Sequence, residues 1–108
     1  MNNPDYWIGY HVGFTRAHPE QVGAEMLSVH ANALSIFMKS PRQFTGALLT
    51  DKVRDRLLEG IRPQLAAREA FMPHAGYAIN LCTSDATKRT KGKESLQVEL
   101  DLCHQLSA

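Results

Sequence analysis

The chain has 108 residues, of which 44% are hydrophobic and 21% are charged, and its formal net charge is +1. This balance is typical of one globular domain and excludes a disordered chain. No apolar run approaches the ~20 residues of a membrane-spanning helix, and the first residues lack the pattern of a secretory signal. We therefore expect an intracellular protein without a membrane partner. Cys82 and Cys103 are expected to be free thiols, because small disulfide-bonded proteins contain more cysteines.

The first half of the chain alternates between strand and helix patterns. Residues 6–12 are aromatic and β-branched, which predicts a buried strand. Pro19 is expected in the first turn of a helix, where its missing N–H has no cost. The apolar face of this helix is expected to contain Val22, Met26 and Val29. Residues 34–38 predict a second strand that ends before Pro41, which cannot donate a ladder hydrogen bond.

The second half repeats this alternation. Thr50 is expected to cap a helix that has Asp51 in its first turn. The buried side of that helix is expected to contain Val53, Leu57, Leu58 and Ile61. Residues 70–72 predict a short third strand, stopped by Pro73. The apolar stripe of a last helix is expected to contain Leu96, Leu100, Cys103 and Leu106. Strands that alternate with helices predict a parallel α/β sheet.

The polar residues of interest follow the three predicted strands. Ligands of parallel α/β folds bind at the carboxyl ends of the strands, so the loops at residues 11–13, 39–44 and 74–77 should converge. Two of the five histidines, His11 and His74, lie at these ends. For His11, a polar lining of the fold and a role near a metal stay equally open.

Basic residues occur in two places. Lys39 and Arg42 share a loop with Phe44, a combination that can contact phosphate and base together. We interpret a second, short basic run as solvated surface. That run contains Lys88, Arg89, Lys91 and Lys93.

The three strand-end loops also carry motifs. The motifs are Ile-Gly-Tyr-His-Val at residues 8–12, Phe-Met-Lys-Ser-Pro-Arg-Gln-Phe at 37–44 and Pro-His-Ala-Gly-Tyr-Ala-Ile-Asn-Leu at 73–81. Together they resemble, in order and approximate spacing, the signature stretches of the endonuclease IV family of apurinic/apyrimidinic endonucleases. The resemblance implies a TIM barrel, which typically needs ~250 residues, so residues 1–108 would form about the first three of eight βα units of one domain.

The resemblance further implies a zinc-dependent hydrolase of base-excision repair, which cleaves the phosphodiester 5′ to an abasic site in double-stranded DNA. His74 is the one residue that matches a ligand of the family's three zinc ions, and the other ligands belong to later strands. No residue is matched as a catalytic group.

The DNA-binding residues that the resemblance implies lie in two of these loops. Arg42 and Tyr77 match the residues that push into the base stack. Lys39, Gln43 and Asn80 match polar residues that contact the DNA or support the loops.

Three functions stay open on the sequence alone. The first is the endonuclease, with the rest of the barrel outside this chain. The second is a non-catalytic fragment with residual DNA binding, and the third is a metal-dependent sugar isomerase or epimerase of the related barrel class. The motif residues Arg42 and Tyr77 argue against the third. Because three strands cut from a barrel have open edges, we expect the isolated chain to self-associate or partly unfold, and to be inactive.

Overall fold

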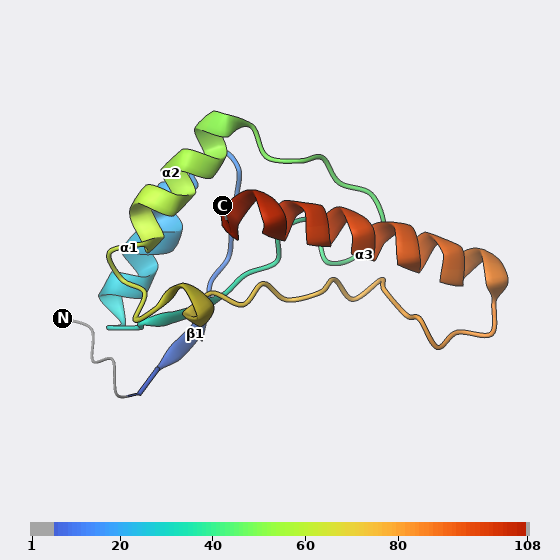
Figure 1. The fold of residues 1–108 in the computed structure, drawn as a ribbon, viewed down its shortest axis with the longest axis horizontal. Helices are drawn as coiled ribbons and strands as arrows, with labels where there is room; N and C mark the ends of the chain where they lie inside the picture. The colour runs from blue at the N-terminus through green and yellow to red at the C-terminus, as the bar shows by residue number, and fades with distance from the viewer. Residues whose placement is uncertain (1–5, 108) are drawn as a thin grey trace.

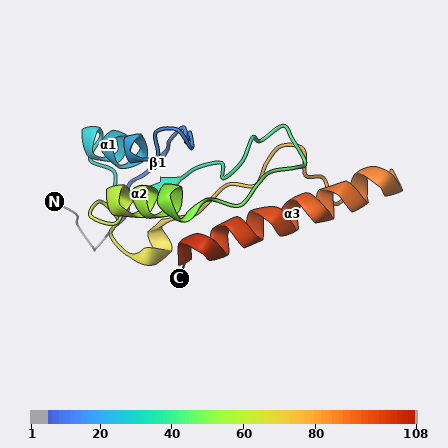
Figure 2. The ribbon, with the colours of Figure 1, turned by 90° about the horizontal axis from the view of Figure 1, so that it is seen from above.

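Two short parallel strands, three α-helices and one 3-10 turn form the described part of the chain, residues 6–107 of this computed structural model (Figure 1). In chain order the elements are β1 (Gly9–His11), α1 (Glu20–Ser28), β2 (Ala33–Ser35), α2 (Asp51–Ile61), η1 (Arg68–Ala70) and α3 (Ala86–Ser107). Helix α1 packs beside α2. The C-terminal end of α3 lies near α2, whereas its N-terminal end extends away from the strands (Figure 1 and Figure 2).

The strands form a small parallel sheet. β1 pairs with β2, with Tyr10 opposite Leu34. A third segment continues the sheet on the other side of β2 through single parallel bridges at Phe71 and His74. The expected parallel α/β arrangement is therefore confirmed, but the third strand is reduced to these bridges, because Ala70 already belongs to the turn η1.

The prediction of a buried strand over residues 6–12 is wrong in two respects. Only Gly9–His11 pair as a strand, and Trp7, Ile8 and Tyr10 are 45%, 56% and 44% exposed. The physical reason is the position of β1 at an edge. Among the described residues β1 pairs only with β2, so nothing covers its other side.

Helices α1 and α2 approach each other at two glycines. A Cβ atom added to Gly23 would lie 2.5 Å from the carbonyl carbon of Gly60 and 2.9 Å from its Cα. The missing side chain therefore lets the two backbones come close enough for the core to close around them. The largest core side chains, each at most 1% exposed, are Val12, Val22, Met26, Leu34, Ile36, Met38, Leu57, Ile61 and Leu102.

The helix ends follow local chemistry. Thr50 caps α2 as predicted, because its side chain accepts a hydrogen bond from an amide of the first turn. Helix α1 ends with His30 in the left-handed region, at a φ of 58°, while the amide of Ala31 donates to the carbonyl of Met26 at 2.9 Å. Glycine is the usual residue at a left-handed position that ends a helix in this way. Val29 lies after the last residue of α1 and is 46% exposed, so its expected place on the apolar face is wrong.

Helix α3 is longer than its apolar stripe suggested. It has 22 residues and begins at Ala86, so the basic run forms its first turns. The expected stripe is wrong at Leu100, which is 54% exposed, because Leu102 instead is fully buried. The buried face of α3 contains Ser95, Glu99, Leu102 and Leu106.

Within residues 6–107, no helix is both long and apolar enough to cross a membrane. Cys82 and Cys103 are free thiols, as expected. Cys82 is exposed, whereas burial, with a smaller contribution from the nearby Glu99, raises the pKa of the Cys103 thiol.

Candidate functional site

Four rings gather at the carboxyl ends of the three parallel segments. His11 ends β1, Phe37 follows β2, and His74 and Tyr77 belong to the third segment. The ring centroid of Phe37 lies 4.8 Å from that of His11, 4.9 Å from that of His74 and 5.1 Å from that of Tyr77. The two histidine rings are 6.0 Å apart. We call these four residues the strand-end cluster, and it confirms the expected convergence of the strand-end loops.

Backbone and side-chain hydrogen bonds orient His74. Its amide donates to the carbonyl of Ile36 at 2.9 Å, which fixes the end of the third segment against β2. Its ring Nδ1 lies 2.6 Å from the carbonyl oxygen of Ala75. Because a carbonyl oxygen only accepts, Nδ1 is the donor in this contact, which leaves Nε2 as the ring atom that can face a metal. Zinc-binding histidines are usually held in this way.

The loop after β2 is organised from inside by Lys39. This residue is only 7% exposed, and its Nζ donates to the carbonyl of Gln43 at 2.6 Å. Its stem packs against Gly46, where an added Cβ would lie 2.8 Å from the Lys39 Cδ. The side chains of Arg42 and Gln43 are exposed. Asn80 is also exposed and accepts a hydrogen bond within its own turn. Contact of these residues with DNA stays a prediction.

Hydrogen bonds from two backbone amides tie the loop of the third segment to its surroundings. The amide of Gly76 donates to both carboxylate oxygens of Glu99, at 3.1 and 3.3 Å. The amide of Ala78 donates to the carbonyl of Pro41 at 3.1 Å. Tyr77 lies between these two anchors and is 65% exposed. The loop of Arg42 and the loop of Tyr77 therefore adjoin.

Sequence reasoning missed two residues of this region. Phe37 lies at the centre of the strand-end cluster. Its signal in the sequence was the alternation of apolar residues around it, which places Phe37 on the opposite face of the strand. These buried neighbours are Leu34, Ile36 and Met38. Glu99 is a carboxylate at helical spacing from Leu102 and Leu106, and its position within that stripe was its signal.

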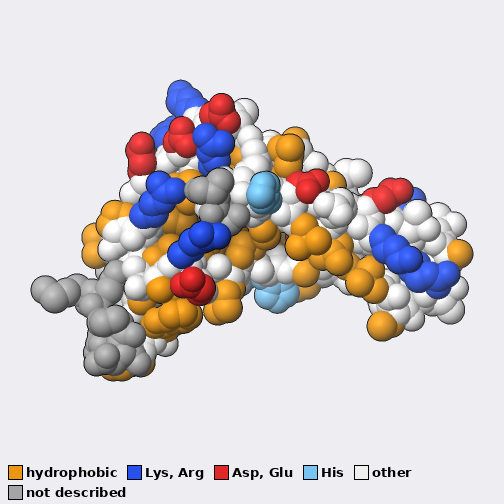
Figure 3. All heavy atoms as spheres, in the orientation of Figure 1, with side chains coloured by type: hydrophobic (Ala, Val, Ile, Leu, Met, Phe, Trp, Pro, Cys, Tyr) orange, Lys and Arg blue, Asp and Glu red, His pale blue; other side chains and the backbone are white. Residues whose placement is uncertain are grey.

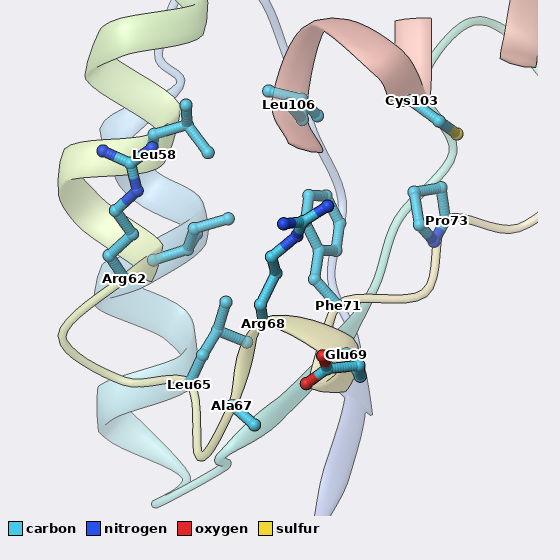
Figure 4. A pocket seen from close by; sticks show the side chains of 11 residues that line it. Leu58, Arg62, Leu65, Ala67, Arg68, Glu69, Phe71, Pro73, Cys103 and Leu106 are labelled. Carbon is cyan, nitrogen blue, oxygen red and sulfur yellow. The ribbon is translucent and has the colours of Figure 1, made fainter. Parts of the chain in front are cut away.

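Two other surface features share no residue with the strand-end cluster. Basic side chains gather at the end of the molecule formed by the first turns of α3 (Figure 3), where Lys88, Lys91 and Lys93 are exposed. An apolar groove of about 610 Å³ lies between α2, η1 and the end of α3. Figure 4 shows the guanidinium of Arg68 pointing into this groove beside the ring of Phe71.

The fold of the chain is similar to part of a known structure. The crystal structure of endonuclease IV from Thermus thermophilus matches 95% of this chain and 38% of that chain, with a TM-score of 0.76 and 22% identity. The fold is therefore that of part of a TIM barrel. No family model matches the chain. "Probable endonuclease 4" of Thermosipho africanus (strain TCF52B) is 31% identical to it over 103 residues, which are 92% of this chain. The chain belongs to the endonuclease IV family.

Two further relatives match shorter stretches of this endonuclease IV family member. "Probable endonuclease 4" of Halorhodospira halophila (strain DSM 244 / SL1) is 49% identical over 37 residues, which are 34% of this chain and 12% of that protein. "Apurinic-apyrimidinic endonuclease 1" of Plasmodium falciparum (isolate 3D7) is 29% identical over 75 residues, which are 69% of this chain and 13% of that protein. The match to the Thermosipho protein spans 35% of its length, so the chain represents about a third of that relative.

The chemistry of the site fits part of a zinc centre. The Nδ1 atom of His74 is engaged by the Ala75 carbonyl, so Nε2 is the ring atom available at the strand end, and His11 places a second imidazole 6.0 Å away. Within residues 6–107, however, no group of three His, Cys, Asp or Glu side chains is arranged to hold a metal ion. In this endonuclease IV family member, His74 is therefore suited to be one ligand of a shared site.

Proposed function

We propose that this chain supplies the first three βα units of a zinc-dependent apurinic/apyrimidinic endonuclease that works inside the cell. The complete protein hydrolyses the phosphodiester on the 5′ side of an abasic site in double-stranded DNA. The observation that best supports this proposal is the orientation of His74, whose ring lies at the strand end, 6.3 Å from that of Tyr77. Membership of the endonuclease IV family supports the same activity.

The residues of this chain would bind and orient the DNA. The exposed ring of Tyr77 and the guanidinium of Arg42 are planar groups on adjoining loops, and both can stack where a base is displaced. Displacement is easiest at an abasic site, because no base there pairs with the opposite strand. His74 would hold one zinc ion through Nε2. Bound zinc supplies a water of lowered pKa and polarises the phosphoryl oxygens.

The remaining zinc ligands would come from strands outside these residues. The open side of β1 supports this part of the proposal, because Trp7, Ile8 and Tyr10 are each more than 40% exposed. The unpaired backbone groups of an edge strand are a template for pairing with another chain, and exposed apolar side chains favour it further. We therefore expect the isolated chain to self-associate and to leave abasic duplex uncut when zinc is added.

The test compares the chain alone with a hybrid in which it replaces the stretch of the Thermosipho protein that it matches. We expect the hybrid to cleave a duplex with one abasic site and to lose this activity when zinc is chelated. The variant His74→Ala should abolish cleavage by the hybrid, since His74 would be a zinc ligand.

The matched control is His18→Ala, which removes an exposed histidine in the segment between β1 and α1. This variant should leave cleavage unchanged. A soluble hybrid that is inactive while the Thermosipho parent is active, or a hybrid that is equally active with His74→Ala, would contradict the proposal.

A further inference from the structure

A carboxylate is buried in the middle of α3, against the loop that carries Tyr77. Glu99 is only 5% exposed, and within residues 6–107 it forms no ion pair with a lysine or arginine. Its hydrogen bonds in this part of the chain both come from the amide of Gly76. A buried carboxylate is unfavourable unless its hydrogen bonds compensate for the lost water. An apolar residue at this position would continue the stripe of Leu102 and Leu106 without the cost of burying a charge. The particular contribution of Glu99 is therefore its hydrogen bonds with the Gly76 amide.

The turn that contains Gly76 also contacts the loop of Arg42. A Cβ added to Gly76 would lie 3.1 Å from the carbonyl oxygen of Pro41, so the two backbones are already in close contact. The amide of Ala78 donates to that same oxygen at 3.1 Å. Glu99 thus fixes one end of the turn and Pro41 fixes the other, with Tyr77 exposed between them.

We propose that Glu99 is a positioning residue for DNA recognition. Its carboxylate anchors the Gly76 amide, and this anchor holds the Tyr77 ring in the orientation that enters the base stack. The effect on DNA rests on the function proposed above, whereas the anchoring of the loop does not. Glu99 acts through Tyr77 and touches no DNA itself.

Hydrogen–deuterium exchange of the chain, measured by mass spectrometry, tests the anchor without DNA. Glu99→Ala should accelerate exchange in the peptide around Gly76 by about tenfold or more, because a hydrogen bond to a charged group is lost. Peptides from α1 and α2 should not change. Glu99→Gln keeps one acceptor oxygen and should give a smaller acceleration. The control Asp101→Asn neutralises an exposed carboxylate of the same helix and should have no effect.

Unchanged exchange around Gly76 in Glu99→Ala would overturn the proposal. If Glu99→Ala accelerates exchange throughout the chain, the result for Glu99→Gln decides. Acceleration in Glu99→Gln that is confined to the Gly76 peptide supports the anchor, and any other exchange pattern of this variant overturns it.

Fluorescence anisotropy tests the effect on recognition, with labelled duplexes that contain or lack one abasic site. The hybrid described above, with its zinc chelated so that the duplex stays uncut, should prefer the abasic duplex, and Glu99→Ala in the hybrid should lower this preference by about tenfold, to the level of Tyr77→Ala. In the Tyr77→Ala background, Glu99→Ala should add nothing, because both changes remove the same contact. Independent, additive effects would overturn the role of Glu99 as a positioning residue. A hybrid without preference would contradict the proposed function, and the exchange experiment would still decide whether Glu99 anchors the loop.

Discussion

The approach of α1 and α2 at Gly23 and Gly60 gives a pair of substitutions that should act in opposite directions. A Cβ at position 23 would lie 2.5 Å from the Gly60 carbonyl carbon and 2.9 Å from its Cα, and closer still to its carbonyl oxygen. A Cβ at position 60 would meet nothing nearer than the carbonyl oxygen of Glu20, at 3.7 Å. The same change, glycine to alanine, is therefore blocked at one position and free at the other.

The magnitude follows from the separation that the new methyl group requires. Carbon atoms pack at about 3.5–4.0 Å, so Gly23→Ala must push the helices apart by about 1 Å. Overpacking of this kind costs about 1–3 kcal/mol, and the wider gap weakens contacts of the core around Met26 and Leu57. Alanine recovers about 1 kcal/mol through its better helix propensity. We expect Gly23→Ala to lower the free energy of unfolding by about 2 kcal/mol, and Gly60→Ala to raise it by up to about 1 kcal/mol.

Urea unfolding followed by far-ultraviolet circular dichroism measures both values. The comparison should be made at equal protein concentration, because self-association would add to apparent stability. The two variants should differ by about 3 kcal/mol, far outside the error of the extrapolation. If Gly23→Ala is as stable as Gly60→Ala, the close approach of the two helix backbones is wrong.

Other changes test single features of the structure. His30→Gly should raise the free energy of unfolding by about 0.5–1 kcal/mol, and with it the thermal midpoint, because glycine adopts the left-handed conformation without strain. A lower midpoint would argue against that conformation. Cys103 is partly buried and its raised pKa lowers its thiolate fraction, whereas Cys82 is exposed, so mass spectrometry should find Cys82 alkylated first at mildly alkaline pH. Equal alkylation rates would contradict the burial of Cys103. Lys39→Met removes the bond to the Gln43 carbonyl and should accelerate proteolysis of that loop; an unchanged cleavage rate would show that Lys39 does not organise it.

The elements that the sequence predicted best are those governed by local chemistry. Thr50 caps α2 as expected, because an N-cap depends only on a side chain and the amides that follow it. The convergence of His11 and His74 was also predictable, since parallel strands place their carboxyl ends at one edge. The roles proposed for these residues rest on the motifs, because spacing alone did not distinguish a zinc ligand from a polar lining.

The features that sequence reasoning missed depend on contacts between distant segments. The aromatic residues 6–12 predicted burial, yet burial of an edge strand requires a neighbour that the described residues do not contain. The hydrogen bond between the Gly76 amide and Glu99 could not be predicted, because the two residues are 23 positions apart in the chain. Leu100, which was expected on the buried stripe, is exposed and Leu102 is buried instead, because the packing of α3 against the rest of the chain determines which face is buried.

The two outer edges of the small sheet have a consequence for the proposed closure of the barrel by strands outside these residues. β1 at one edge and the segment around Phe71 and His74 at the other each have a single neighbour among the described residues. A ring of strands closes only when both edges are matched together, since a strand added at one edge creates a new unpaired edge. Closure of the barrel should therefore be cooperative. An intermediate in which only one edge is paired gains little stability, and only the closed ring leaves no unpaired strand edge.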